Sequence, residues 1–209
     1  MSDVQVPLLP THYYHIYNHA IGKENLFNNE EDYQYLLDKI KPHILPVCHI
    51  LSYCLMPNHY HFVVQIKSLQ EVSSFLEIKH GADKFNRKKS ADENYIVNQI
   101  CQQFSNLFNT YAKHYNFHSD RWGGLFKRNF RRKEITDTDY LKRVICYVHQ
   151  NPVEAGFVRS MNDWKFSSYL AFQSSMETFV ARDETLELFG GRENYDAFHS
   201  VRCGLMDGF

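Results

Sequence analysis

The fold of this chain is decided by Leu-Met-Pro-Asn-His-Tyr-His-Phe-Val-Val, residues 55–64. Two apolar and aromatic runs, residues 47–55 and 59–67, lie on either side of its Met-Pro-Asn, and proline and asparagine are typical turn residues. The pattern therefore predicts a β-hairpin. Because side chains two apart on a strand share a face, His59 and His61 are expected on the same side of the second strand. Two imidazoles on one face are able to bind one metal ion.

The histidine spacing alone does not show that the pair binds a metal ion. With twelve histidines in the chain, such a pair also arises by chance, so two half-buried structural histidines are the alternative. The surrounding sequence favours a functional pair, because an aromatic residue separates the two histidines and apolar residues follow them.

The segments around the hairpin predict further strands and helices. Residues 11–18 are rich in aromatic residues and predict a first strand. Residues 29–41 have apolar side chains at helical spacing and acids in the first turn, so they predict an amphipathic helix closed by Pro42. Residues 99–115 predict a second helix, and a third begins at 136–138 and is expected to stop at Pro152. The sequence thus predicts an α+β fold.

The chain reads as a single domain over residues 1–209, since 209 residues with 44% hydrophobic composition suffice for one core. Residues 68–98 lack strong periodicity and are expected to form a loop or an insertion. From residue 164 onward we expect a peripheral tail, with residues 171–209 as a C-terminal extension rich in acids.

The charge of the chain is unevenly distributed. A formal net charge of -1 argues against nucleic acid as a partner, but residues 121–133 hold six cations and no acid. We expect this run to contact a phosphate backbone, and Phe126 and Phe130 could join its tryptophan in stacking on unpaired bases. A solvated loop or edge strand with ordinary core aromatics is the alternative. The predicted DNA-binding residues are Arg121, Trp122, Lys127, Arg128, Arg131, Arg132 and Lys133.

The third predicted helix ends in Tyr-Val-His-Gln-Asn-Pro-Val-Glu-Ala-Gly, residues 147–156. On a helical wheel, Tyr147 and Asn151 lie one turn apart at the margin of the apolar stripe. A hydroxyl in that position is suited to act as a nucleophile, and an amide one turn along is suited to bind a metal or orient a phosphate. Taken alone, the pattern equally describes an interfacial tyrosine and a proline-terminated helix.

The three motifs, in this order, resemble the HUH-type single-tyrosine transposases, particularly the group that contains the REP-associated tyrosine transposases. The resemblance spans residues 11–170 and includes the first strand and Trp-Lys-Phe-Ser-Ser-Tyr at 164–169. It implies the HUH endonuclease fold, a ferredoxin-like antiparallel sheet with flanking helices. It also implies that His59 and His61 bind a divalent cation, Mg²⁺ or Mn²⁺, that Asn151 is the third ligand, and that Tyr147 attacks DNA. Glu154 departs from the family, which often has a basic residue there.

This resemblance predicts a metal-dependent single-stranded DNA endonuclease and strand transferase that forms a 5′-phosphotyrosine link. Its substrate is expected to be single-stranded or hairpin DNA at a palindromic end. Two alternatives remain: a domesticated DNA-binding regulatory protein of the same fold, and a metal phosphoesterase that uses the histidine pair. One tyrosine nucleophile per chain leaves a homodimer open.

The remaining features concern location. Five cysteines with no Cys-x-x-Cys pair favour a reducing compartment, and neither a signal sequence nor an apolar run of about 18 residues is present. We therefore predict a cytoplasmic protein without a membrane partner. Cys48, His49, Cys54 and His149 are interpreted as structural.

Overall fold

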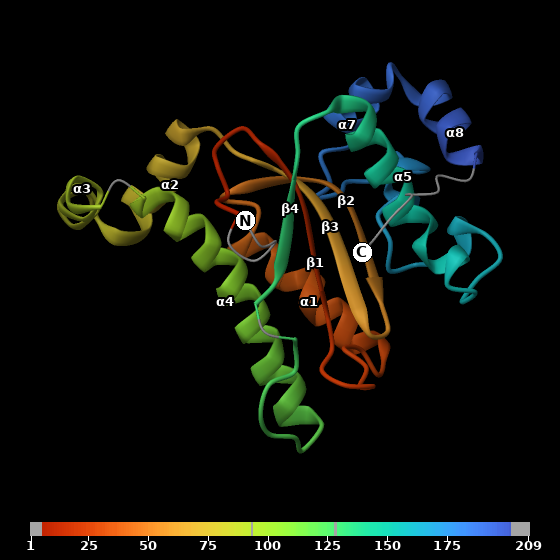
Figure 1. The fold of residues 1–209 in the computed structure, drawn as a ribbon, viewed down its shortest axis with the longest axis horizontal. Helices are drawn as coiled ribbons and strands as arrows, with labels where there is room; N and C mark the ends of the chain where they lie inside the picture. The colour runs from red at the N-terminus through yellow and green to blue at the C-terminus, as the bar shows by residue number, and fades with distance from the viewer. Residues whose placement is uncertain (1–5, 93, 128, 202–209) are drawn as a thin grey trace.

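The computed structural model describes residues 6–92, 94–127 and 129–201, and its fold is shown in Figure 1. These residues form a four-stranded sheet in the order β2-β3-β1-β4, and every neighbouring pair is antiparallel. The strands are β1 (Tyr13–His19), β2 (Cys48–Met56), β3 (His59–Ile66) and β4 (Arg131–Ile135). Because helices pack on this sheet, the prediction of an α+β fold with an antiparallel sheet and flanking helices is confirmed.

The hairpin predicted from residues 47–67 is the β2-β3 pair. Met56 pairs with His59 across the turn, and the register shifts between Ile50 and Ser52, which marks a bulge. The turn is held from outside, because the backbone N–H of Leu26 donates to the carbonyl of Pro57 at 2.6 Å. Strand β3 is therefore a central strand with β2 on one side and β1 on the other.

The two faces of the sheet carry different side chains. On one face, Tyr60 of β3 stacks on Phe108 with ring centroids 4.7 Å apart, and the side chains of Tyr14 and Ile16 are fully buried. On the other face lie alternate residues of the same strands, among them His15 and His61. The sheet thus separates an apolar core layer from a face that carries histidines.

Helices cover both faces and extend beyond them. Helix α4 lies on the apolar face beside α1, whereas α5 packs on β2 and β3 from the histidine face (Figure 1). The helices are α1 (Glu30–His43), α2 (Leu69–His80), α3 (Ala82–Ala91), α4 (Tyr95–His118), α5 (Thr138–Glu154), α6 (Tyr169–Phe172), α7 (Arg182–Phe189) and α8 (Arg192–Ser200), with a 3-10 turn η1 (Met161–Asp163).

The prediction that two helices end at a proline is wrong, because each helix continues past its proline. Pro42 lies inside the last turn of α1, and Pro152 lies inside α5, which continues to Glu154. A proline near the end of a helix removes a single backbone hydrogen bond, and the following Ala155 N–H still donates to the carbonyl of Asn151 at 2.9 Å. The last turn of α5 therefore stays helical and keeps Asn151 on the same side as Tyr147.

The expectation of a loop at residues 68–98 is also wrong, because the segment forms α2, α3 and the start of α4. Helix α2 begins with a capping box in which the Ser68 and Glu71 side chains satisfy each other's backbone N–H groups. Helix α3 buries only Phe85 among its side chains that the structure describes. A helix with so narrow an apolar contact produces no periodic hydrophobic signal.

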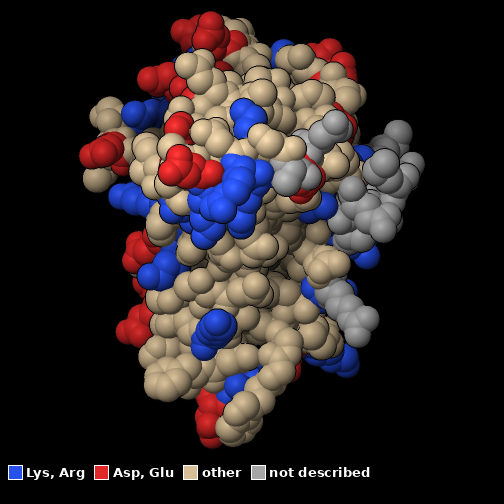
Figure 2. All heavy atoms as spheres, turned by 90° about the vertical axis from the view of Figure 1, so that its left-hand side faces the viewer, with Lys and Arg blue, Asp and Glu red and all other residues tan. Residues whose placement is uncertain are grey.

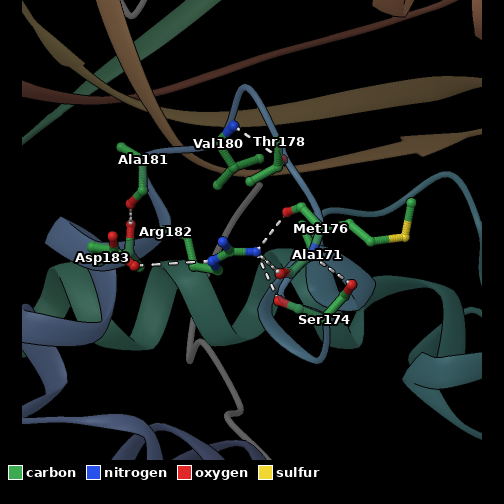
Figure 3. Close-up of polar contacts among 9 residues, drawn as sticks. Ala171, Ser174, Met176, Thr178, Val180, Ala181, Arg182 and Asp183 are labelled. Atoms are coloured by element: carbon green, nitrogen blue, oxygen red, sulfur yellow. Dashed lines mark hydrogen bonds and ion pairs between the residues drawn. The ribbon is translucent and has the colours of Figure 1, made fainter.

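The segment that follows residue 164 is not a peripheral tail. The backbone N–H of Ala181 donates to the carbonyl of Ile50 in β2 at 2.8 Å, and Phe172 and Tyr195 are fully buried. Figure 3 shows how Arg182 holds the connecting loop: its Nη1 donates to the carbonyls of Ala171, Ser174 and Met176 at 3.1, 2.7 and 2.9 Å. The C-terminal helices are thus part of the core.

Two further observations concern membrane-crossing helices and the cysteines. Within the described ranges, no helix combines the length and apolar character that crossing a membrane requires. The described cysteines Cys48, Cys54, Cys101 and Cys146 are free thiols, and Cys203 lies outside the described residues.

Candidate functional site

The paired histidines open strand β3 and face helix α5. His61 is 2% exposed and His59 is half-buried, and their rings meet edge to face with centroids 5.0 Å apart. Burial lowers the pKa of His59 to about 4 and that of His61 well below its usual value. Both imidazoles are consequently neutral at neutral pH, which is the form that binds metals.

Strand β1 adds more rings to this face. His15 is fully buried, and its Nε2 lies 2.8 Å from Nδ1 of His61, within hydrogen-bonding distance. Tyr17 stacks on His15 with centroids 4.8 Å apart, and His19 stacks on His59 at the same distance. Sequence reasoning missed these three residues, although the alternation His-Ile-Tyr-Asn-His at 15–19 places them on one face of a strand.

Helix α5 brings the predicted nucleophile to the histidines. The Tyr147 ring lies edge-on to His61 with centroids 5.6 Å apart, and Oδ1 of Asn151 lies 3.1 Å from Nε2 of His59. Asp137 begins this helix by accepting from the N–H of Tyr140, and buried residues anchor it on β2 and β3. The structure thus brings together the four predicted site residues, while their roles remain predictions.

The surroundings of Tyr147 shift the pKa of its hydroxyl group in opposite directions. Burial raises its pKa above the ordinary value of a phenol, and the charge of Glu154 raises it further. The hydrogen bond to the Asn151 side chain lowers it. Tyr147 is therefore a protonated phenol at neutral pH, and Asn151 is the neighbour that favours its anion.

The site fits a divalent cation by its donor set. Within the described ranges, no three His, Cys, Asp or Glu side chains gather as a metal site, so a cation here needs an amide beside the two histidines. Oδ1 of Asn151 lies 3.1 Å from Nε2 of His59, within hydrogen-bonding distance, so the amide oxygen and one histidine nitrogen already lie side by side.

The basic run 121–133 divides between the two faces of the sheet. In β4, Arg131 pairs with Tyr17 and Lys133 with His15, and directly paired residues share a face. Arg131 and Lys133 therefore lie on the histidine face. Arg132 points to the opposite face, where it lies over the ring of Phe130 and donates to the carbonyl of Val6.

The other predicted DNA contacts differ in exposure. Arg121 forms an ion pair of 2.5 Å with Glu24 and donates to the carbonyl of Gly124, so the structure gives it a role in holding the loop. Trp122 is 82% exposed and Lys127 is exposed, whereas Arg128 lies outside the described residues.

Two aromatic residues of the run belong to the core. Phe130 is 8% exposed and half-buried Phe126 packs against Phe108 with centroids 5.6 Å apart. The expectation that Phe130 stacks on bases does not fit this burial, because its ring packs against Phe104 and Phe108 with centroids 5.5 and 5.6 Å away.

His149, interpreted as structural, is confirmed in that role. Its Nδ1 lies 2.9 Å from Nε2 of His199, and its Nε2 lies 2.7 Å from Oγ of Ser168. Burial lowers the pKa of His149 well below its usual value and that of His199 to about 4. With His15 and His61 they make up the four buried histidines of the described chain. Cys48 and Cys54 are buried as well.

Comparison with known proteins finds a curated relative and a solved structure with related descriptions. No protein-family model matches the chain. A curated Haemophilus influenzae protein described as a candidate REP-associated tyrosine transposase is 24% identical over 119 residues. The match spans 57% of this chain and 57% of that relative, a little more than half of each. A solved REP-associated tyrosine transposase bound to a REP hairpin shares the fold, with a TM-score of 0.52 and 14% identity over 86% of this chain and 90% of the other.

The sequence match shows the likeness to this kind of protein, and the structural match shows a shared fold. The sequence match agrees with the resemblance suggested by the three sequence motifs. This chain is similar to a REP-associated tyrosine transposase over part of its sequence, and it shares the fold of a solved one.

Proposed function

We propose that this protein cuts and rejoins single-stranded DNA at hairpin ends, with Tyr147 as the nucleophile. The observation that carries the proposal is the convergence of Tyr147 with His59, His61 and Asn151 on one face of the sheet. The curated relative, and the solved structure bound to a REP hairpin, support hairpin DNA as the substrate.

The reaction follows from the groups on this face. The Tyr147 hydroxyl oxygen forms a bond to phosphorus while the bond from phosphorus to the 3′ oxygen breaks. The phenol releases its proton and the 3′ oxygen gains one, so the step consumes no net proton. The products are a 5′-phosphotyrosine link and a free 3′-hydroxyl, and the retained phosphoester allows rejoining without a nucleotide cofactor.

Asn151 has two roles in this scheme. Its hydrogen bond favours the phenolate of Tyr147, which burial and Glu154 disfavour. Together with His59 and His61, its side chain would hold Mg²⁺ or Mn²⁺. Such an ion supplies a Lewis acid for the phosphate oxygens and orients them.

In this proposal, Arg131 and Lys133 contact the backbone of the same DNA strand. Both lie on the histidine face, at the edge strand β4, where a strand passing the site is accessible to them. Their charges supply the sequence-independent and salt-dependent part of the affinity. Dimerisation and cytoplasmic location remain predictions.

A DNA hairpin with single-stranded flanks, labelled at its 3′ end, tests the proposal. A 5′-phosphotyrosine link leaves the 3′ fragment on the protein, so wild-type protein with Mn²⁺ or Mg²⁺ is expected to carry the label on a denaturing gel. The same DNA labelled at its 5′ end is expected to release a free labelled fragment. Tyr147→Phe is expected to lose both products, whereas Tyr140→Phe, a matched tyrosine on the same helix, keeps them.

Other outcomes separate the alternatives. Cleavage without labelled protein supports a phosphoesterase in which the histidine pair activates water. Binding without cleavage supports a regulatory DNA-binding protein. Either result contradicts the assignment of Tyr147 as the nucleophile.

A further inference from the structure

A groove separates helix α4 from the segment that leads into β4. It has a volume of about 680 Å³ and lies between α4 and residues 123–127, 129, 130 and 132. The face of the molecule formed by α2, α3 and α4 carries basic side chains over its middle and acidic ones mostly toward its edges (Figure 2).

The groove has the chemistry of a nucleic-acid site. Its charged lining residues among the described chain are Lys113, Lys127 and Arg132, with no carboxylate among them. Amide side chains line it as well, including Asn109 and Asn116, and half-buried Phe126 contributes an apolar surface. Cations suit phosphates, amides suit base edges, and aromatic carbons suit base faces.

The groove reaches the edge of the histidine site. Lys127 lines the groove, and its backbone N–H donates to the carbonyl of His19 at 2.9 Å. Asn18 also lines the groove and donates to the carbonyl of Lys127 at 3.0 Å, while the next residue, His19, stacks on His59. The end of β1 therefore has the groove on one side and the proposed active site on the other.

We infer that this groove binds unpaired nucleotides of the DNA strand next to the phosphate at Tyr147. The inference rests on the proposed function, because it takes its ligand from the strand that passes the active site. A single strand fits better than a duplex, since apolar and amide groups inside the groove match base surfaces that a duplex keeps stacked. Lys113 and Asn109 of α4 are then binding residues that the basic run does not contain.

The test compares two DNA ligands on proteins that carry Tyr147→Phe, so that the DNA stays intact. One ligand is a hairpin with single-stranded flanks, and the other is the same hairpin without flanks. The groove variant combines Asn109→Ala with Lys113→Gln. The control variant removes the same two group types from α3, Asn86→Ala with Lys84→Gln, all four positions being exposed.

The groove variant is expected to bind the flanked hairpin about tenfold more weakly, with its salt dependence reduced by about 0.7 in log-log slope for one lost single-strand phosphate contact. Its affinity for the hairpin without flanks should stay within about twofold, as should both affinities of the α3 control. Unfolding midpoints are expected to match, because the substituted side chains are exposed.

Equal loss of affinity for both ligands would overturn the inference, because the groove would then bind the stem. Unchanged binding of the flanked hairpin would overturn it too. A third outcome separates the two proposals. If the groove variant loses affinity only for the flanked hairpin and the wild-type protein forms no adduct at Tyr147, the groove assignment stands and the catalytic proposal fails.

Discussion

Replacing His15 with leucine removes one hydrogen bond from the centre of the histidine cluster while keeping a side chain of similar bulk. In the wild type, Nε2 of His15 lies 2.8 Å from Nδ1 of His61, and both rings are buried. If His61 binds a cation through Nε2, its Nδ1–H donates to His15, which then orients the ligand. The substitution leaves that N–H without this acceptor in a buried site.

Two magnitudes follow. Leaving a buried polar group without its partner costs about 1–3 kcal/mol of the free energy of unfolding. For a chain of this length, that lowers the unfolding midpoint by about 2–12 °C. Losing the partner of a metal ligand weakens metal affinity by about 10- to 100-fold.

Mn²⁺ binding to the free protein, measured by calorimetry or electron paramagnetic resonance, separates orientation from stability. Val72→Ala, a buried change in α2, is the control for lost stability and should keep wild-type Mn²⁺ affinity. His15→Gln, which supplies an amide acceptor, should recover part of the affinity. Wild-type Mn²⁺ affinity in His15→Leu would refute the reasoning, and equal loss in Val72→Ala would attribute the effect to general destabilisation.

Three further outcomes are expected. Glu154→Gln removes a charge that raises the pKa of Tyr147, so the pH profile of adduct formation should move to lower pH, and an unmoved profile would contradict this electrostatic role. Arg182→Met removes the donor to three loop carbonyls and should lower the free energy of unfolding by about 2–4 kcal/mol in urea titrations, whereas a loss below about 0.5 kcal/mol would assign the loop's order to other contacts. The four buried histidines have folded pKa values below the unfolded value of about 6.5, so only the unfolded chain gains their protons as the pH falls. Stability in urea should therefore be level above about pH 7 and fall below pH 6.5, by about 1.4 kcal/mol per pH unit for each histidine; a level curve down to pH 5 would contradict the burial of these rings.

The parts of the fold with strong local signals could be predicted from the sequence. The hairpin at 47–67 has two β-rich runs around Pro57 and Asn58, and α4 has a long apolar stripe. Helix α3 could not be recognised, because its one buried described side chain, Phe85, leaves no period to detect. The C-terminal helices were missed because their burial depends on docking against β2, which local sequence does not reveal.

The site was predictable to a similar extent. His59, His61 and Tyr147 belong to motifs with recognisable spacing. His15 was missed because its contact with His61 requires β1 to lie beside β3, and strand order is not written in either segment. The basic run predicted a positively charged segment but not which way each side chain points. That follows only from the strand β4, in which Arg131 and its neighbour Arg132 lie on opposite faces.

The most direct test of the central claim is to identify the residue that bonds to DNA. Wild-type protein is incubated with flanked hairpin DNA and Mn²⁺, digested with nuclease and protease, and the peptides are sequenced by mass spectrometry. We expect a nucleotide joined through its 5′ phosphate to the peptide that contains Tyr147, at Tyr147 itself. A nucleotide on another residue, or cleaved DNA with every peptide unmodified, would contradict the claim.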